Sequence, residues 1–150
     1  MIVYKKVNAQ LLEAALKIRR EMLGIIYGKD ESEFEGEFTR LSAEYFTHGD
    51  QTTVLAYDGE KAIGCATICY ITLMPTFDHP SGKRAHLMNV YVNADYRRQG
   101  IAREMVTTLL DEARERKVGY VSLDATENGR PLYKTLGFKE NEENMGISIP

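Results

Sequence analysis

The segment at residues 89–103 combines the residue types that hold an anion on backbone amides. An apolar stretch ends at Val92, a short polar turn follows, and a helix is expected to begin near Gly100. The first turn of a helix has N–H groups without intrahelical partners and carries the positive end of the helix dipole. Such a turn is a ready site for a phosphate group, so the segment predicts phosphate binding.

Small residues at this turn would let a phosphate reach the backbone. Gly100 and Ala102 have no bulky side chain, so the amides of residues 99–103 should be accessible. Arg97 and Arg98 add positive charge at the rim and can form charge-assisted hydrogen bonds. Taken alone, the same residues also fit a solvated loop before an ordinary helix.

A second segment, at residues 128–138, places a tyrosine where a leaving group would need a proton. A short helix is predicted there, with Asn128 as a cap-like residue and Pro131 near its first turn. Tyr133 would lie in the last turns of this helix, near the cleft between two parallel strands. Its hydroxyl could protonate a departing thiolate, or the side chain could be a core tyrosine with its hydroxyl at the surface.

Strands and helices that could position these segments are visible in the apolar pattern. We expect strands at residues 2–7, 52–57, 61–73, 86–92 and 120–125, and one or two closing strands within residues 138–149. We expect helices at residues 9–24, 31–46, 100–117 and 128–136, with Asn8 capping the first and Gly137 closing the last.

This order of elements predicts an α/β (α+β) fold in a single domain, residues 1–150. The Asp58-Gly59 pair between two apolar runs indicates a hairpin. The strand–helix–strand unit at residues 86–125 requires a parallel pair with a right-handed crossover. The expected sheet is therefore mixed, with six to seven strands flanked by about four helices.

The overall composition argues against several classes of protein. The chain has 150 residues, 43% of them hydrophobic, which is enough apolar material for one folded core. Its formal net charge of −3 argues against a general binder of nucleic acid or membrane surfaces. Any anion that the protein binds must therefore be met by a local positive site.

The two cysteines, Cys65 and Cys69, are expected to be buried, reduced thiols in one strand. Four positions apart on a strand they are too distant for easy bridging, and no second pair of Cys or His residues has metal-ligand spacing, so no metal is expected. The sequence also lacks a signal-peptide core and an apolar run of bilayer length. We predict a soluble, cytoplasmic protein.

Together the two segments resemble the GNAT superfamily of acyl-CoA N-acyltransferases. The acyl-CoA signature of the family is Arg/Gln-x-x-Gly-x-Gly/Ala, and the Arg-Arg-Gln-Gly-Ile-Ala stretch at residues 97–102 matches it throughout. The second family element, Asn-x-x-x-x-Tyr-x-x-x-Gly-Phe, is met by Asn128, Tyr133, Gly137 and Phe138. The likeness covers nearly the whole chain in element order and residues 86–138 in specific residues.

The resemblance implies direct transfer of an acetyl group from acetyl-CoA to an amine of a small molecule or polypeptide. The diphosphate of acetyl-CoA would lie on the amides of residues 98–103, and its pantetheine arm along the strand ending at Val92. That strand and the one beginning at Tyr120 would splay apart and leave a slot for the thioester. A backbone N–H near Val90 or Val92 would stabilise the oxyanion, and Tyr133 would protonate the sulfur.

On this basis Tyr133 is assigned as the catalytic residue. The positions assigned to acyl-CoA binding are Val90, Tyr91, Val92, Arg97, Arg98, Gln99, Gly100, Ile101, Ala102, Arg103, Asn128 and Tyr133. The implied reaction has no covalent acyl-enzyme, so neither cysteine needs to react.

The general base and the acceptor are left open. Many members of the family use a carboxylate, but no glutamate lies on the predicted strand at residues 86–92, and the candidates by location are His86, Asn89 and Asp124. The acceptor pocket is expected between the first two helices and the loop at residues 75–83, where acidic side chains would suit a cationic amine. Because proteins of this family are commonly dimers, the resemblance also implies a homodimer.

Two other functions compete with the transferase. One is a non-catalytic acyl-CoA-binding or sensor module on the same fold, since fold alone does not settle function. The other is an RNA-binding surface around Arg97 and Arg98, which the acidic balance of the remaining residues disfavours.

Overall fold

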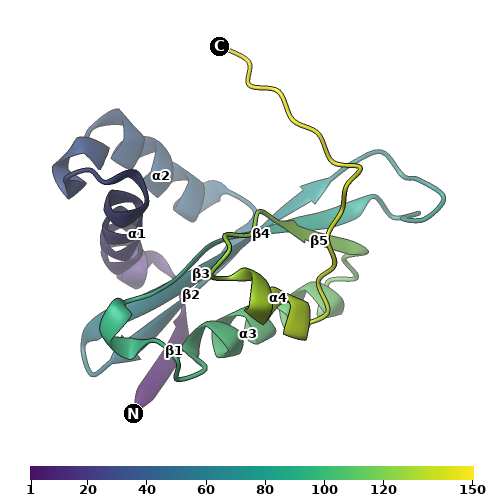
Figure 1. Cartoon of the computed structure of the whole chain (residues 1–150). Helices are drawn as coiled ribbons and strands as arrows, with labels where there is room; N and C mark the ends of the chain where they lie inside the picture. Colours follow the sequence, from purple (N-terminus) through teal and green to yellow (C-terminus); the bar gives the residue numbers. More distant parts are fainter.

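The chain forms a five-stranded mixed sheet with helices on both faces, and two of its inner strands are buried on both sides (Figure 1). The computed structural model describes all 150 residues. The strands, in spatial and chain order, are β1 (Ile2–Lys6), β2 (Gln51–Asp58), β3 (Lys61–Thr72), β4 (Lys83–Val92) and β5 (Tyr120–Leu123). Each neighbouring pair is antiparallel except β4 and β5, which run parallel. The mixed α+β fold predicted from the sequence is thereby confirmed.

Four α-helices cover the sheet, two on each side (Figure 1). They are α1 (Leu12–Tyr27), α2 (Glu37–His48), α3 (Ile101–Glu115) and α4 (Arg130–Thr135). The larger core lies between the sheet and α3, where Leu87, Met105 and Leu109 are almost fully buried. A smaller core lies between the sheet and α1. None of the helices has the length and apolar character needed to cross a bilayer.

Capping at its start and a left-handed glycine at its end define the limits of the first helical region. The Asn8 side chain accepts hydrogen bonds from the amides of Gln10 and Leu11, which confirms its predicted capping role. The helix continues past the predicted end at Gly24 and stops at Gly28, whose φ of 63° closes the last turn. Gly24 does not have a positive φ and lies within the helix, so the presence of a glycine there did not mark the helix end as predicted.

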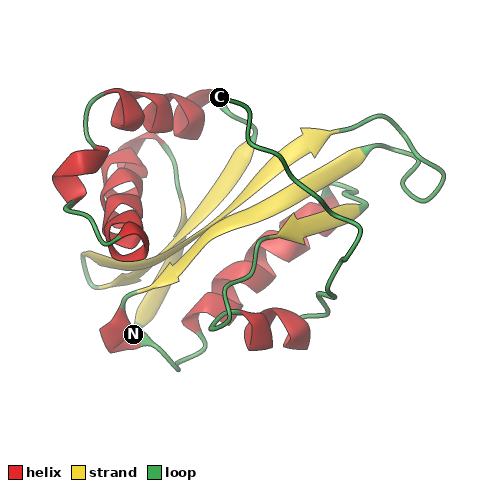
Figure 2. Cartoon of the chain, turned by 45° about the horizontal axis from the view of Figure 1, so that its top comes forward, coloured by secondary structure: helices red, strands yellow, loops and turns green.

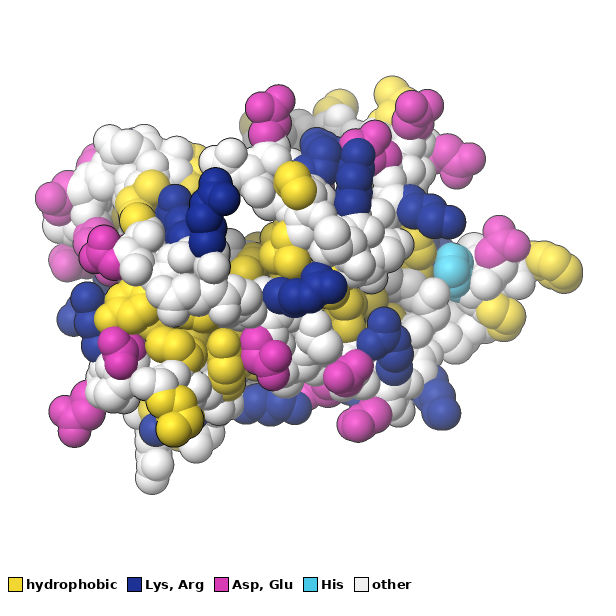
Figure 3. Space-filling model, turned by 60° about the horizontal axis from the view of Figure 1, so that its bottom comes forward, with side chains coloured by type: hydrophobic (Ala, Val, Ile, Leu, Met, Phe, Trp, Pro, Cys, Tyr) yellow, Lys and Arg dark blue, Asp and Glu magenta, His cyan; other side chains and the backbone are white.

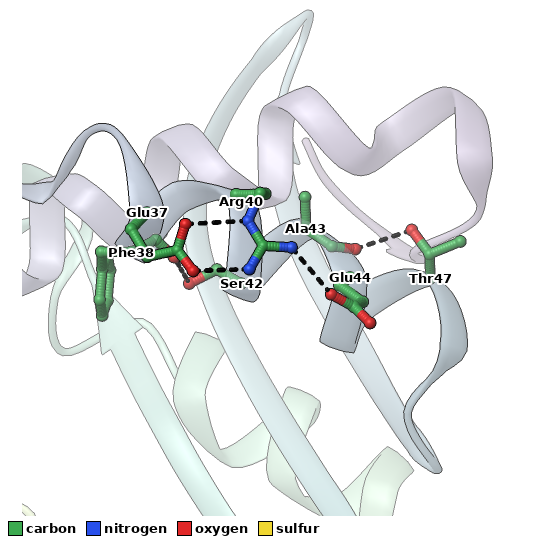
Figure 4. Close-up of polar contacts among 7 residues, drawn as sticks. All are labelled: Glu37, Phe38, Arg40, Ser42, Ala43, Glu44 and Thr47. Carbon is green, nitrogen blue, oxygen red and sulfur yellow. Dashed lines mark hydrogen bonds and ion pairs between the residues drawn. The ribbon is translucent and has the colours of Figure 1, made fainter.

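The second helix is shorter than predicted and lies mainly on the surface. Glu31–Phe34 is a separate 3-10 turn, and Gly36, with a φ of 73°, separates it from α2. No residue of α2 is buried. Its outer face is tied together by Arg40, which forms ion pairs with Glu37 and Glu44 (Figure 4).

The predicted count of six to seven strands is wrong, because residues 138–149 form no strand. Only Phe138 of this segment packs against the core. Of the next five residues, four are charged and the fifth is Asn141, whose side chain accepts the Glu143 amide and makes a local turn. Met145 and Ile147 are then 93% and 86% exposed. The segment crosses β5, where Asn141 donates to the Tyr120 hydroxyl, and then runs on away from the strand (Figure 2).

A bulge in β4 distorts the sheet next to the motif segment. Cys65 pairs with Tyr91 and Thr67 with Met88, so Asn89 and Val90 together face one residue of β3. Asn89 adopts a φ of 56° to make this bulge. Close by, Gly64 pairs with Val92, and a Cβ on it would lie 2.9 Å from the Tyr91 carbonyl oxygen and 3.3 Å from Met105 Cε. The absence of a side chain at Gly64 lets the bulged strand pack closely.

We therefore expect Gly64→Ala to lower the free energy of unfolding by about 1–3 kcal/mol, because the new methyl group would push the bulged strand and Met105 apart. Urea denaturation followed by circular dichroism measures the change. Gly146→Ala is the matched control, since a Cβ there meets no atom within 4 Å. Equal stability of the two variants would show that the bulge does not need the glycine.

Candidate active site

The parallel pairing of β4 with β5 uses all of β5 but ends five residues before the end of β4. Hydrogen-bonded register runs from Arg84 opposite Tyr120 to Leu87 opposite Leu123 and goes no further. The bulge at Asn89 follows at once on β4, while β5 gives way to a loop after Leu123. The backbone of β4 from residue 88 to residue 92 therefore has no strand partner on its β5 side, and the splayed gap expected from the family is present.

The turn that enters α3 presents a row of free backbone amides. The N–H groups of residues 98–103 have no hydrogen-bond acceptor in the protein, and the first helical bond is from the Glu104 amide to the Gly100 carbonyl. Arg98 and Gly100 adopt left-handed φ values of 63° and 77°. A Cβ on Gly100 would meet no atom within 4 Å, so the turn is open to solvent. This geometry suits an anion such as a diphosphate.

The arginines around this turn differ in availability. Arg98 is exposed and makes no hydrogen bond, whereas Arg97 Nε donates to the Val92 carbonyl at 3.1 Å and Arg103 Nη1 donates to Thr135 Oγ1 at 2.9 Å. On the face drawn in Figure 3, lysine and arginine side chains are scattered among acidic ones. An anion at α3 would therefore be held by local amides rather than by a broad positive surface.

Several of the assigned positions can contribute only backbone atoms. Val90 and Val92 pack their side chains toward the α3 core, and Ile101 is 3% exposed. Tyr91 points to the opposite face of the sheet, where its hydroxyl donates to Glu21. Gln99 is exposed and Ala102 partly exposed at the turn, where neither amide has a partner.

Tyr133 lies on α4 with its ring largely covered. The ring packs edge-on to Phe138, with 5.8 Å between the ring centroids. It also lies against Gly129, where an added Cβ would come within 3.0 Å of the tyrosine ring. Burial raises the pKa of the Tyr133 phenol above its ordinary value, so the hydroxyl stays protonated at neutral pH. No residue of the protein accepts a hydrogen bond from this hydroxyl, so it is free to serve a ligand.

The predicted cap at Asn128 is wrong. Asn128 is exposed and makes no side-chain hydrogen bond, and Gly129 is the N-cap residue of α4. The hydroxyl of Thr126 accepts the Gly129 amide instead, and the Thr126 carbonyl accepts the Arg130 amide. The Thr126 side chain, three residues before Gly129, therefore provides the capping hydrogen bond that we expected from Asn128.

His86 sits at the last register pairs before the gap and has polar partners on both ring nitrogens. Its Nδ1 is 2.8 Å from Ser122 Oγ on β5, and its Nε2 is 3.6 Å from Asp124 Oδ2. The Ser122 hydroxyl in turn lies 3.5 Å from the Ala85 carbonyl. Two of the three residues considered as the base are thus brought together. Asn89, the third, is the left-handed bulge residue, and its amide cannot titrate.

Neither thiol is placed for catalysis. Cys65 donates to the Asn89 carbonyl at 3.1 Å, and complete burial raises its pKa to about 12. Cys69 is also buried and free, as predicted, and lies against Met88. No group of three His, Cys, Asp or Glu side chains is arranged to hold a metal ion.

These features coincide with a match to a known family. The family model described as "Acetyltransferase (GNAT) family" matches residues 9–138. The chain belongs to this family. The match spans both motif segments as well as the helices and strands between them.

Known GNAT proteins resemble the chain in sequence and structure. A predicted acetyltransferase from Clostridium acetobutylicum, solved with acetyl-CoA, is 27% identical with a TM-score of 0.84, covering 99% of this chain and 96% of that one. N-acetyltransferase 8 from Homo sapiens is 35% identical over 73% of this chain and 48% of its own length. Glucosamine 6-phosphate N-acetyltransferase from Trypanosoma brucei brucei is 26% identical over 59% of this chain and 58% of its own length. The chain thus spans about half the length of these two curated relatives.

Two of the cavities in the GNAT chain bear on where an acceptor could bind. The larger, about 910 Å³, is lined by β3, β4, β5, α4 and residues 138–144, and it includes His86 and Tyr133. The smaller, about 490 Å³, lies under the end of α1 and includes Glu21, Asp30 and Glu31. Only the smaller one uses the helices that we expected to build the acceptor pocket, and neither uses the loop at residues 75–83, which projects beyond the sheet (Figure 2).

Sequence reasoning missed three residues that position this GNAT site. Ser122 is opposite His86 only because of the β4–β5 register, which no local pattern reveals. The ring of Tyr133 packs against Gly129, four positions earlier in the chain. Residues four positions apart lie on the same face of a helix, so this contact could have been predicted. Arg84 lines the larger cavity two residues before His86, and strand alternation alone would have placed both on one face.

We expect Gly100→Glu to abolish measurable CoA binding, because the new carboxylate would stand against the diphosphate at the free amides. Isothermal titration with CoA measures the affinity. Gly100→Ala is the control, since it imposes the same left-handed backbone strain, about 1–2 kcal/mol, without a charge. Equal CoA affinities of the two variants would rule out anion binding at this turn.

Proposed function

We propose that this GNAT protein transfers an acetyl group from acetyl-CoA to an amine while both are bound. The observation that carries the proposal is the convergence of three features on one gap: the free amides of residues 98–103, the unpaired edge of β4, and the protonated hydroxyl of Tyr133. The residues fit the co-substrate, since amides suit its diphosphate and a strand edge suits the amide groups of its pantetheine arm.

Holding both substrates at the gap would supply much of the rate enhancement. Two bound reactants in the correct orientation react as if unimolecular, which removes a large entropic part of the barrier. Backbone N–H groups on the unpaired edge of β4 would stabilise the negative charge that develops on the acetyl oxygen. Neither contribution needs a covalent acyl-enzyme, which agrees with the inert environment of Cys65.

The protein's own residues would move two protons. His86 Nε2 would take the proton that the amine loses as its nitrogen bonds to the acetyl carbon, and Asp124 would stabilise the resulting imidazolium. Tyr133 would give its proton to the sulfur as the carbon–sulfur bond breaks. The proton on His86 then returns to solvent and water reprotonates Tyr133, so the net products are an amide and free CoA.

A thiol-release assay separates a transferase from an acyl-CoA-binding module. The protein is incubated with acetyl-CoA and a panel of amines, amino acids, polyamines and peptides, and free CoA is measured with a thiol reagent. A transferase should release free CoA only when an acceptor amine is present. Tight CoA binding with no acceptor-dependent release across the panel would favour the sensor module instead.

We expect Tyr133→Phe to lower kcat by about 10²-fold or more, because it removes the acid that protonates the leaving sulfur. CoA affinity should change little, since the ring that packs on Gly129 and Phe138 is retained. Steady-state kinetics with a substrate from the panel and CoA titration measure both effects. Tyr4→Phe, on the opposite edge strand β1, is the control. An unchanged kcat in the Tyr133 variant would assign the acid to another group or to water.

A further inference from the structure

Arg84 is a partly buried cation that no acid in the protein neutralises. Its side chain lines the larger cavity, yet it forms no salt bridge and donates no hydrogen bond. Its Nε is buried without any partner, alone among the buried side-chain nitrogen and oxygen atoms. Leaving such a group unsatisfied is unfavourable, and almost all buried polar groups in proteins find a partner.

The other cations of this cavity are neutralised or solvated. Arg130 and Lys134 both pair with Glu140, at 2.7 Å and 3.8 Å. Lys139 is exposed and therefore keeps its water. The guanidinium of Arg84 instead faces the Tyr120 ring, with 5.8 Å between the guanidinium carbon and the ring centroid. A flat aromatic surface on one side leaves the guanidinium edge free to receive an anion.

Arg84 and His86 share one face of β4. They are two positions apart on a strand, so their Cα atoms are about 7 Å apart and both side chains point into the same cavity. Tyr133 lines that cavity as well. An acceptor whose amine lies at His86 would therefore extend past Arg84, and any negative group it carries a few bonds from the amine would reach the guanidinium.

We propose that the acceptor is an amine that carries a carboxylate or phosphate, and that Arg84 binds this anionic group while His86 takes the amine proton. The inference rests on the proposed transferase function. Arginine matches planar carboxylate and phosphate oxygens with two parallel hydrogen bonds. A polycationic amine, by contrast, would bring further positive charge toward an unneutralised arginine. This acceptor class differs from the cationic amine for which acidic helices were expected.

Matched pairs of small amines test the proposal with acetyl-CoA as donor. The pairs are β-alanine against propylamine, and phosphoethanolamine against ethanolamine. We expect the member of at least one pair that carries the anionic group to have a kcat/KM about tenfold or more above its partner that lacks this group. The pair with the larger ratio tells whether the bound group is a carboxylate or a phosphate. No preference for either anion in the wild-type protein would overturn the proposal.

Substitution of Arg84 assigns the preference to this residue. Arg84→Gln should reduce the ratio within the pair to near one by lowering kcat/KM for the anionic member, and Arg84→Lys should retain part of the preference. Arg40→Gln removes one positive charge from the exposed face of α2 and serves as the control. A preference that survives Arg84→Gln would refute the assignment. Weakened CoA affinity in that variant would also refute it, because the arginine would then serve the phosphates of CoA.

A binding measurement keeps this test separate from the transferase proposal. β-Alanine and phosphoethanolamine are titrated calorimetrically into the wild-type protein and Arg84→Gln, each saturated with CoA. If no amine is acetylated but an anionic amine binds only to the wild-type protein, the arginine site stands and the transferase function fails. If neither anionic amine binds the wild-type protein, the arginine site itself is refuted.

Discussion

The early end of hydrogen bonding between β4 and β5 is the constraint on which the site depends. A parallel pair that continued beyond Leu87 would satisfy both strands and close the sheet. The bulge at Asn89 prevents this, and Gly64 on β3 leaves room for the bulged backbone. Backbone groups without partners are unfavourable unless water or a ligand satisfies them. The distortion thus keeps an extended edge open to an extended polar molecule, and it brings His86 to the rim of the opening.

The open edge is useful because the surrounding elements are rigid. Ile101, Met105 and Leu109 anchor α3 in the larger core, so the first turn of the helix is held at the end of β4. Arg103 ties α3 to α4 through Thr135, and Gly129 and Phe138 fix the ring of Tyr133. Amides, hydroxyl and imidazole are therefore oriented before any ligand arrives. Preorganised dipoles of this kind need little rearrangement during a reaction.

Much of this arrangement follows from sequence patterns, and the failures have physical causes. The helix start at Gly100 and the placement of Tyr133 on a short helix were predictable, because glycine, proline and apolar spacing act over a few residues. The sequence offered His86 and Asp124 as candidates for the general base but could not predict that they lie close together. Their contact depends on the register between β4 and β5, which are distant in the sequence. The strands expected after Phe138 did not form, because the acidic stretch that follows it makes a turn at Asn141 and the later isoleucines stay exposed.

The turn before α3 uses main-chain groups, and this affects how the chain can change over evolutionary time. Side chains at residues 99 and 103 are exposed, and their amides would remain in place whichever residues carried them. Such positions should tolerate wide substitution in a saturation-mutagenesis library. Intolerance should instead concentrate at Gly100, because residues with side chains rarely adopt its left-handed φ of 77°, and at Ile101, whose burial fixes the turn. Sequence drift at the rim could then change the surface charge of the turn while its free amides stay in place.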